Sequence, residues 1–274
     1  MKICVIFTCH NRAEKSKKCV ESLLEGNRDF ELFFIVVDDG SSDNTVEKLE
    51  SINNEYHNIQ ILKGEGNLFY SKGMRMGMQW LNDSDRQFDY VLLINDDVEF
   101  KKEVIEKLVN ESQAKNDAII VGAMHDDSGN FTYGGVSFKK GTIKQKYMSP
   151  EKADVLCDTF NANCVLIPWK AYINCEPMDG YYDHSFGDFD YGFSLRRKGN
   201  EIYTSSFFAG KCNRNEKKGT WLDSSLPRLE RLRQKESPKG LPFKSYFYYL
   251  NKNFGLCQAL LHAFTPYIKI LLKI

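Results

Sequence analysis

The first third of the chain alternates short apolar runs with longer segments of helical periodicity, and this alternation limits the fold more than any other feature. Each run is rich in β-branched and aromatic residues, which is typical of strands buried on both faces of a sheet. Such alternation predicts βαβ units and a mainly parallel sheet. The expected strands cover 2–7, 32–37, 59–63 and 90–94, and the expected helices cover 14–24, 44–53 and 71–81. In the last helix, Met74, Met78 and Leu81 form a one-face stripe that predicts core packing.

The rest of the chain extends this α/β pattern and then changes in composition. The expected elements are a helix over 101–115, a buried strand over 118–123, a glycine-rich hairpin over 126–147, a strand over 160–167 and a short helix over 190–198. Beyond residue 213 basic residues outnumber acidic ones, and aromatic side chains cluster between 243 and 249. We therefore expect an α/β domain over 1–212 and a basic, aromatic, mostly helical C-terminal extension over 213–274.

The composition argues against several classes of protein. Lys and Arg total 37 and Asp and Glu total 37, so the formal net charge of zero provides no general attraction to nucleic acid. The eight cysteines are scattered without a Cys-x-x-Cys spacing. This distribution argues against a zinc ribbon or a disulfide framework, and it indicates reduced thiols in the cytoplasm.

The sequence indicates neither a secretory signal nor a membrane-spanning helix. The N-terminal apolar run is too short for a signal, and no segment reaches the roughly eighteen apolar residues that a spanning helix needs. The apolar stretch at the C-terminus is interrupted by His262, Pro266 and Lys269, which indicates an interfacial or core segment. We expect a cytoplasmic protein, and peripheral contact with the inner face of the membrane stays open.

Polar segments follow three of the expected parallel strands. They are Thr8-Cys9-His10-Asn11-Arg12, Asp38-Asp39-Gly40-Ser41 and Asn95-Asp96-Asp97. Ligands bind beyond the carboxyl ends of strands in open α/β sheets, so we expect the three segments to meet in one site. Asp-Gly-Ser sequences also form ordinary turns and helix caps, so no single segment identifies a site on its own.

Two groups of carboxylates are candidates for chemistry. Asn95-Asp96-Asp97 places hard oxygen ligands at a strand end, which suits Mg²⁺ or Mn²⁺; the alternative is an acidic cap on the next helix. Asp188 and Asp190 lie at the start of the short helix, where they either act in catalysis or stabilise the helix N-terminus.

With these segments in place, the chain resembles the inverting nucleotide-sugar glycosyltransferases of family two, which have the GT-A fold. The resemblance covers roughly residues 2–240 and depends on Thr8-Cys9-His10-Asn11-Arg12, Val37-Asp38-Asp39-Gly40-Ser41-Ser42-Asp43, Asn95-Asp96-Asp97, and Gly187-Asp188-Phe189-Asp190 followed by Leu195-Arg196. It implies a Rossmann-like, mainly parallel central sheet with flanking helices, a nucleotide-binding half over 1–97 and an acceptor and catalytic half over 98–212. Segments 64–75 and 237–242 are similar to a rhamnosyltransferase-like subgroup that builds surface polysaccharides.

The resemblance implies how the nucleotide sugar is bound. Asp39 accepts the imide N–H of a uracil or thymine base, while Thr8 and Arg12 line the nucleoside pocket. Asp97 is the implied principal ligand of Mn²⁺ or Mg²⁺, and Asp96 lies beside it near the ribose or the metal.

The resemblance also implies the catalytic groups. Asp188 matches the general base of the family, and Asp190 belongs to the same acidic motif in a supporting role. An acceptor hydroxyl is a poor nucleophile, so a carboxylate must take its proton as it attacks. A divalent cation neutralises the negative charge that develops on the leaving nucleoside diphosphate. A single displacement of this kind inverts the anomeric centre.

The chain departs from the family pattern at several positions. His10 stands where tyrosine is common, and Arg75 stands where Asp or Asn is frequent. The late loop 210–215 lacks the histidine that some members add as a metal ligand. His184, just ahead of the acidic pair, is expected to face solvent from a loop; the alternative is that it contacts the donor or the acceptor.

Together the residues and the resemblance predict a metal-dependent inverting glycosyltransferase that moves a sugar from a UDP- or dTDP-sugar to a glycan or lipid-linked glycan acceptor. One alternative is a sugar-phosphate nucleotidyltransferase, which would normally carry a glycine-rich, basic loop soon after the first strand. Another is a non-catalytic protein that binds sugar nucleotides. The C-terminal extension either contacts an anionic, lipid-linked acceptor at a membrane surface or packs on the catalytic domain as an ordinary appendage.

Overall fold

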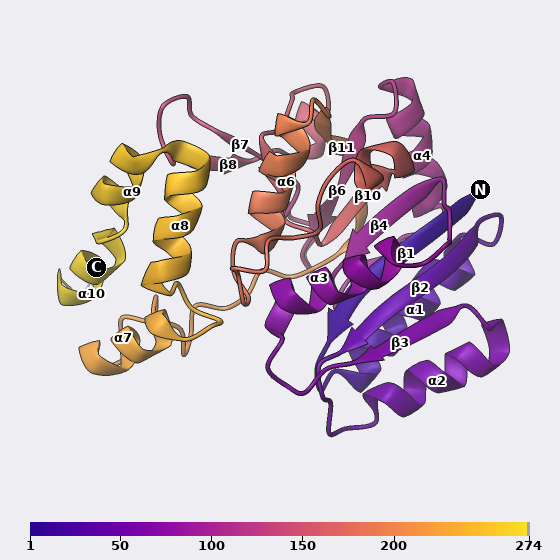
Figure 1. Cartoon of the computed structure of the whole chain (residues 1–274), viewed down its shortest axis with the longest axis horizontal. Helices are drawn as coiled ribbons and strands as arrows, with labels where there is room; N and C mark the ends of the chain where they lie inside the picture. The colour runs from indigo at the N-terminus through magenta and orange to yellow at the C-terminus, as the bar shows by residue number, and fades with distance from the viewer. Residues whose placement is uncertain (273–274) are drawn as a thin grey trace.

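An eight-stranded sheet forms the centre of the protein, and the computed structural model describes residues 1–272 (Figure 1). Its strands are β1 (Lys2–Cys9), β2 (Glu31–Asp38), β3 (Ile59–Lys63), β4 (Tyr90–Ile94), β5 (Glu99–Phe100), β6 (Ile119–His125), β10 (Cys164–Pro168) and β11 (Ile202–Lys211). They lie in the order β3-β2-β1-β4-β10-β6-β11-β5. The first four in this order are parallel neighbours, β11 is parallel to β6, and β10 and β5 run against their neighbours. The predicted mainly parallel sheet is confirmed.

Helices cover both faces of this sheet (Figure 1). One face is packed by α1 (Ala13–Gly26), α2 (Thr45–Tyr56) and α4 (Val104–Ala114), and the other by α3 (Phe69–Asn82), α5 (Trp169–Ile173) and α6 (Gly187–Arg197). Successive residues of a strand point to opposite faces, so Val5 of β1 packs in the first core and Ile6 packs in the second. Both are fully buried, as the continuous apolar runs predict.

Helix α3 links the core to the edge of the sheet where the polar segments lie. Its Met74, Met78 and Leu81 side chains are fully buried, which confirms the predicted core stripe. Gly73 lies against the end of β1, where an added Cβ would come within 2.5 Å of Thr8 Oγ1. The missing side chain therefore allows α3 to approach the carboxyl end of β1 closely.

A second, three-stranded sheet and the C-terminal helices complete the fold (Figure 1). The small sheet contains β7 (Gly135–Phe138), β8 (Gln145–Tyr147) and β9 (Thr159–Phe160), and the C-terminal helices are α7 (Arg228–Glu236), α8 (Phe243–Phe254), α9 (Leu256–His262) and α10 (Thr265–Leu272). Tyr249 and Leu250 of α8 are buried with Val136 of β7 and Phe189 of α6. The predicted helical extension is therefore present and packs on the α/β part of the chain. Within residues 1–272, none of the helices combines the length and apolar composition needed to cross a membrane.

Two elements near the end of the α/β part differ from the sequence prediction. The single strand expected over 160–167 is two strands in different sheets, because residues 161–163 lead from β9 in the three-stranded sheet to β10 in the eight-stranded sheet. The short helix begins at Gly187 rather than at Asp190. Asp188 therefore lies inside the first turn of α6 and not in the loop before it.

Strand β11 is absent from the sequence prediction, in which residues 210–215 form a loop. Its Thr-Ser-Ser centre, which begins at Thr204, interrupts the apolar run that would identify a buried strand. Its register with β6 also shifts between Thr204 and Phe208 and again between Phe208 and Gly210. Such bulges break the alternation of side chains on which strand prediction depends.

Candidate active site

A cavity of about 610 Å³ lies at the carboxyl ends of β1, β2 and β4. These strands are parallel neighbours, so the polar segments that follow them reach the cavity from adjacent positions. The residues predicted for the site that line this cavity are Thr8, Arg12, Asp39, Asp96, Asp97 and Asp188. Asp190 is buried, and it is not one of the described residues that line the cavity.

The carboxylate of Asp39 organises the loop between β3 and α3. Its Oδ1 accepts the backbone N–H groups of Gly66 and Leu68 at 2.9 and 3.1 Å, and its Oδ2 accepts that of Phe69 at 2.9 Å. Gly64 passes so close that an added Cβ would lie 2.7 Å from Oδ1. Asp39 is therefore a structural anchor of this loop, in addition to being part of the cavity wall.

A side-chain amide joins the segment after β1 to the segment after β2. Asn11 has a left-handed backbone with a φ of 51°, and its Oδ1 accepts the backbone N–H groups of Ser42 and Asp43 at 2.7 and 3.3 Å. Beside it, His10 Nδ1 donates to the carbonyl oxygen of Asp39 at 2.7 Å. The sequence identifies both segments, but no spacing or periodicity predicts that Asn11 connects them.

Arg12 forms ion pairs with both carboxylates that follow β4. Its guanidinium lies 2.8 Å from Asp96 Oδ1 and 3.0 Å from Asp97 Oδ2. Burial lowers the pKa of Arg12, but the two carboxylates outweigh burial and raise its pKa overall. Burial raises the pKa of Asp96 to about 6, an effect that Arg12 opposes and Asp97 reinforces. The three side chains form a partly buried charge cluster in the cavity wall.

This acidic pair offers hard oxygen ligands without forming a complete metal cage. Residues 1–272 contain no group of three or more His, Cys, Asp or Glu side chains that could hold a metal ion. Mg²⁺ is commonly held in proteins by one or two carboxylates together with substrate phosphates and water. Asp96 and Asp97 fit a cation of this kind when a phosphorylated ligand supplies the remaining oxygens.

Asp188 is a buried carboxylate in the first turn of α6, with 9% of its surface exposed. Its Oδ2 accepts the backbone N–H of Ala162 at 3.2 Å and the side-chain amide of Asn161 at 3.3 Å. Burial raises the pKa of this carboxyl, and the N–H donors of Ala162, Phe189 and Asn161 oppose the rise. A carboxylate with a raised pKa is a stronger proton acceptor, which suits a general base.

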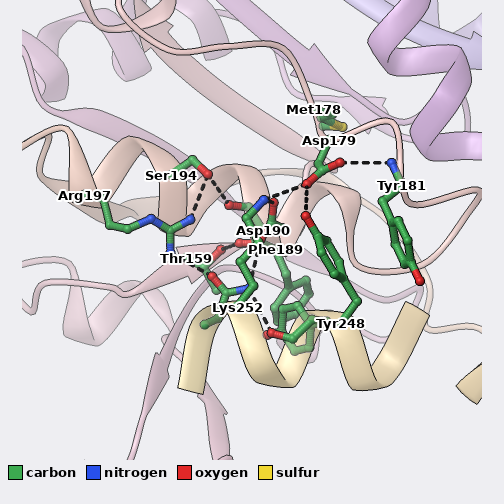
Figure 2. Close-up of polar contacts among 12 residues, drawn as sticks. Thr159, Met178, Asp179, Tyr181, Phe189, Asp190, Ser194, Arg197, Tyr248 and Lys252 are labelled. Carbon is green, nitrogen blue, oxygen red and sulfur yellow. Dashed lines mark hydrogen bonds and ion pairs between the residues drawn. The ribbon is translucent and has the colours of Figure 1, made fainter. Parts of the chain in front are cut away.

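Asp190 faces helix α8 instead of the cavity (Figure 2). Its Oδ2 lies 2.7 Å from Lys252 Nζ, and its Oδ1 accepts the side-chain amide of Asn253 at 2.9 Å. Lys252 also lies 2.7 Å from Asp179 Oδ2. Burial lowers the pKa of Lys252, but the two carboxylates raise it more, so the ammonium group stays charged. With only 1% of its surface exposed, Asp190 joins α6 to α8.

The C-terminal extension contributes part of the cavity wall that sequence reasoning does not assign. The lining includes Lys239, Tyr246, Tyr249, Leu250 and Phe254. The aromatic cluster at 243–249 is visible in the sequence, but its position beside the strand-end segments depends on how α8 packs. The site therefore draws on both the α/β part and the extension.

His184 also lines the cavity, so the prediction that it faces solvent is wrong. Its ring lies edge-on to the rings of Phe69 and Tyr70, with centroid separations of 6.5 and 6.3 Å. Burial, followed by the charges of Lys239 and Arg12, lowers the pKa of His184 to about 4. The imidazole is therefore neutral at physiological pH.

We expect Asp39→Ala to reduce the free energy of unfolding by about 2–3 kcal/mol, because it removes the acceptor of three backbone N–H groups. Urea denaturation followed by circular dichroism measures this change. Asp85→Ala, at an exposed position, is the matched control and should be close to wild type. Equal stability of the two variants would contradict the anchoring role of Asp39.

Several solved structures share this fold. The mannosyltransferase PcManGT from Pyrobaculum calidifontis, solved with GDP-Man and Mn²⁺, has a TM-score of 0.62 over 99% of this chain and 73% of its own, at 10% identity. S. aureus TarS 1-349 in complex with UDP has a TM-score of 0.58 over 97% and 75%, at 14% identity. GalNAc-T7 with UDP, GalNAc and Mn²⁺ has a TM-score of 0.61 over 93% and 58%, at 13% identity. At these identities the similarity establishes the GT-A fold alone.

Sequence comparisons establish the family. Glycosyltransferase GlyG of Streptococcus pneumoniae serotype 4 is 25% identical over 134 residues, which span 48% of this chain and 42% of GlyG. The match therefore covers less than half of that protein's length. The rhamnosyltransferase-like subgroup stays a prediction. The family model for glycosyl transferase family 2 matches residues 4–167, which is more than half of the chain. The chain therefore belongs to glycosyl transferase family 2.

Proposed function

We propose that this protein transfers a hexosyl or deoxyhexosyl group, with inversion, from a UDP- or dTDP-sugar to a glycan or lipid-linked glycan acceptor in surface-polysaccharide synthesis. The observation that carries the proposal is the cavity, in which an arginine-paired acidic cluster and a buried carboxylate of raised pKa line the same space. The first group suits the charge of a nucleoside diphosphate, and the second suits removal of a proton from a hydroxyl. The motifs favour the rhamnosyltransferase-like subgroup.

The nucleotide binds among the strand-end segments. A carboxylate has about four lone-pair sites. Three backbone N–H groups of the loop between β3 and α3 bind the Asp39 carboxylate. One lone-pair site therefore remains to accept the imide N–H of uracil or thymine. Thr8, whose Oγ1 donates to the Val37 carbonyl at 3.0 Å, and Arg12 line the nucleoside pocket. Asp96 lies near the ribose.

Asp97, with Asp96 beside it, would hold Mn²⁺ or Mg²⁺. Such a cation would supply positive charge to neutralise the charge that develops on the leaving nucleoside diphosphate. Two of the structures that share the fold contain Mn²⁺, which supports this assignment. Arg12, which pairs with both carboxylates, would turn to the donor phosphates when the donor and the cation bind, so charge in the site stays compensated.

Asp188 acts as the general base. The acceptor oxygen forms a bond to the anomeric carbon, its proton passes to Asp188, and the nucleoside diphosphate leaves with the electrons of the broken bond. Burial disfavours the charged form of Asp188, so its carboxylate takes up the proton readily. Asn161 and Ala162 orient this carboxylate through their hydrogen bonds to Oδ2.

The acceptor binds on the side of the cavity that residues 98–212 and the extension 213–274 form, while residues 1–97 hold the nucleotide. Tyr246, Tyr249 and Phe254 of the extension line the cavity and offer ring faces for stacking on acceptor sugars. Lys239, in the same lining, is placed to attract a phosphate of a lipid-linked acceptor.

The extension also makes peripheral contact with an anionic membrane at its cytoplasmic face. Leu260, Leu261, Phe264 and Ile268 of the last helices and the turn between them are each more than half exposed. The exposed basic residues of this region include Arg228, Arg233, Lys239 and Lys244, whereas Arg231 and Lys235 are buried. Exposed apolar side chains combined with basic charge are typical of interfacial helices.

A thermal-shift panel of nucleotide sugars with and without Mn²⁺ tests the donor class. We expect a UDP- or dTDP-sugar with Mn²⁺ to raise Tm, since a ligand at 100 times its Kd adds about 2.7 kcal/mol of stability. Asp97→Ala should lose the Mn²⁺-dependent part of the shift, whereas the exposed Asp85→Ala should retain it. Equal Mn²⁺-dependent shifts in both variants would refute the metal role of Asp97. Stabilisation only by a nucleoside triphosphate with a sugar phosphate would indicate a nucleotidyltransferase.

Asp188→Asn should lower transfer by on the order of 10²–10⁴-fold and leave donor Kd nearly unchanged, because an amide cannot accept the proton. In the wild type, kcat should fall as pH drops through the raised pKa of Asp188, since the protonated carboxyl is no longer a base. Steady-state transfer assays and calorimetry with the donor measure these changes. Transfer by the variant at a rate near wild type would show that another group accepts the proton.

Co-sedimentation with anionic liposomes tests the membrane contact. We expect the wild type to bind, and Leu261→Gln combined with Phe264→Gln to bind less, because both side chains are exposed and apolar. Val155→Gln combined with Leu156→Gln removes two exposed apolar side chains elsewhere and serves as the matched control. Negligible binding by the wild type, or equal binding by the two double variants, would rule out this surface. Substitutions are preferable to truncation because α8 lines the cavity.

A further inference from the structure

Helix α8 contacts residues on both sides of the proposed base. Phe186 lies two positions before Asp188, and Asp190 lies two positions after it. Phe186 stacks on aromatic rings of α8, and Asp190 pairs with polar groups of α8. The C-terminal extension therefore holds the segment that carries Asp188 at both ends.

The contact before the base stabilises an unfavourable backbone. Phe186 has a φ of 75°, in the left-handed region that bulky residues rarely adopt. Its ring stacks on that of Tyr249 at a centroid distance of 4.5 Å and on that of Tyr246 at 5.6 Å, with interplanar angles of 17° and 16°. Strained backbone persists only where the surrounding structure holds it in place. Here α8 supplies two of the rings that hold it.

The contact after the base is an ionic cluster around the buried carboxylate of Asp190 (Figure 2). Both oxygens of Asp190 are bound by consecutive residues of α8, Lys252 at 2.7 Å and Asn253 at 2.9 Å. The same lysine lies 2.7 Å from Asp179, whose Oδ2 also accepts the hydroxyl of Tyr248 at 2.9 Å. A buried carboxylate requires compensation of this kind, because burial strongly disfavours an unpaired charge.

These contacts do more than attach the extension. The apolar cluster that contains Val136, Leu250 and Ala259 also attaches α8, but apolar contacts are not directional. Hydrogen-bonded ion pairs have preferred distances and angles, so the cluster around Lys252 sets the position of α8 along α6. The position of α8 then determines the position of the first helical turn of α6, which carries Asp188.

We propose that α8 positions Asp188 for proton removal, and that Lys252 is the positioning residue that couples the C-terminal extension to this turn through Asp190. The inference rests on the role proposed for Asp188. It also joins two functions in one helix, because Tyr249 lines the cavity and stacks on Phe186. Helix α8 therefore fixes the acceptor side of the cavity and the base relative to each other.

Kinetics of Lys252→Met test this coupling, with Lys170→Met, at an exposed lysine of α5, as the matched control. We expect Lys252→Met to lower kcat by on the order of 10- to 100-fold, because a small displacement of a catalytic group is costly. The donor KM should stay unchanged, because Lys252 lies outside the cavity lining. Lys252→Arg should recover most of kcat, since a guanidinium can pair with Asp179 and Asp190 together. A wild-type kcat in Lys252→Met would overturn the proposal.

Hydrogen–deuterium exchange of residues 186–190 provides a second readout that needs no turnover. Exchange in this segment should be faster in Lys252→Met than in the wild type or in Lys170→Met, while exchange in β1 stays the same. If the wild type transfers no sugar, the proposed function fails, but exchange still decides whether α8 holds this turn. Unchanged exchange in Lys252→Met would overturn the proposal.

A milder variant covers the case in which Lys252→Met does not fold. Asn253→Ala removes the hydrogen bonds of this side chain to Asp190 and to Arg197 of α6, and it leaves the ion pair between Asp190 and Lys252 in place. It should change kcat and exchange of residues 186–190 in the same direction as Lys252→Met, by a smaller amount. An effect on neither quantity would overturn the proposal.

Discussion

Parallel pairing of β1 with β2 and β4 is the constraint on which the site depends. The register places Thr8 opposite Val37 and Cys9 opposite Asp38, so the strands end at the same edge of the sheet. The polar segments that follow are brought together by this pairing although they are far apart in the chain. Asp39 and Asn11 then hold these segments as ordered loops by accepting backbone N–H groups. Strand register comes first in building the cavity, and side-chain hydrogen bonding completes it.

Buried carboxylates near the cavity differ in what compensates them, and this difference separates their roles. Asp96 is paired with Arg12 and keeps a charge cluster in the wall. The hydrogen bonds described for Asp188 come from N–H donors alone, and burial raises its pKa. Asp190 is paired with Lys252 and connects two helices. Burial raises the pKa of both Asp96 and Asp188, but in Asp96 the charge of Arg12 opposes the rise, whereas in Asp188 only N–H donors oppose it.

The change in composition near residue 213 marks a boundary in the sequence, but the site contains residues from both sides of that boundary. Side chains of α8 line the cavity together with strand-end residues from the first hundred positions. The aromatic character of the extension is therefore part of the site as well as of its packing, since Tyr249 takes part in both. The helices after residue 213 are consequently an integral part of this glycosyltransferase fold.

Local patterns in the chain were enough to predict the alternation of strands and helices over residues 2–94, the segments at the strand ends and the family, because periodicity and short motifs involve neighbouring residues. They were not enough for β11, whose bulged register depends on pairing with β6 and β5. The partners of Arg12 lie 84 and 85 residues away, and the lysine that pairs with Asp190 lies 62 residues away. Contacts across the fold therefore assigned each carboxylate its cation or its lack of one, because burial and charge depend on distance in space and not on separation along the chain.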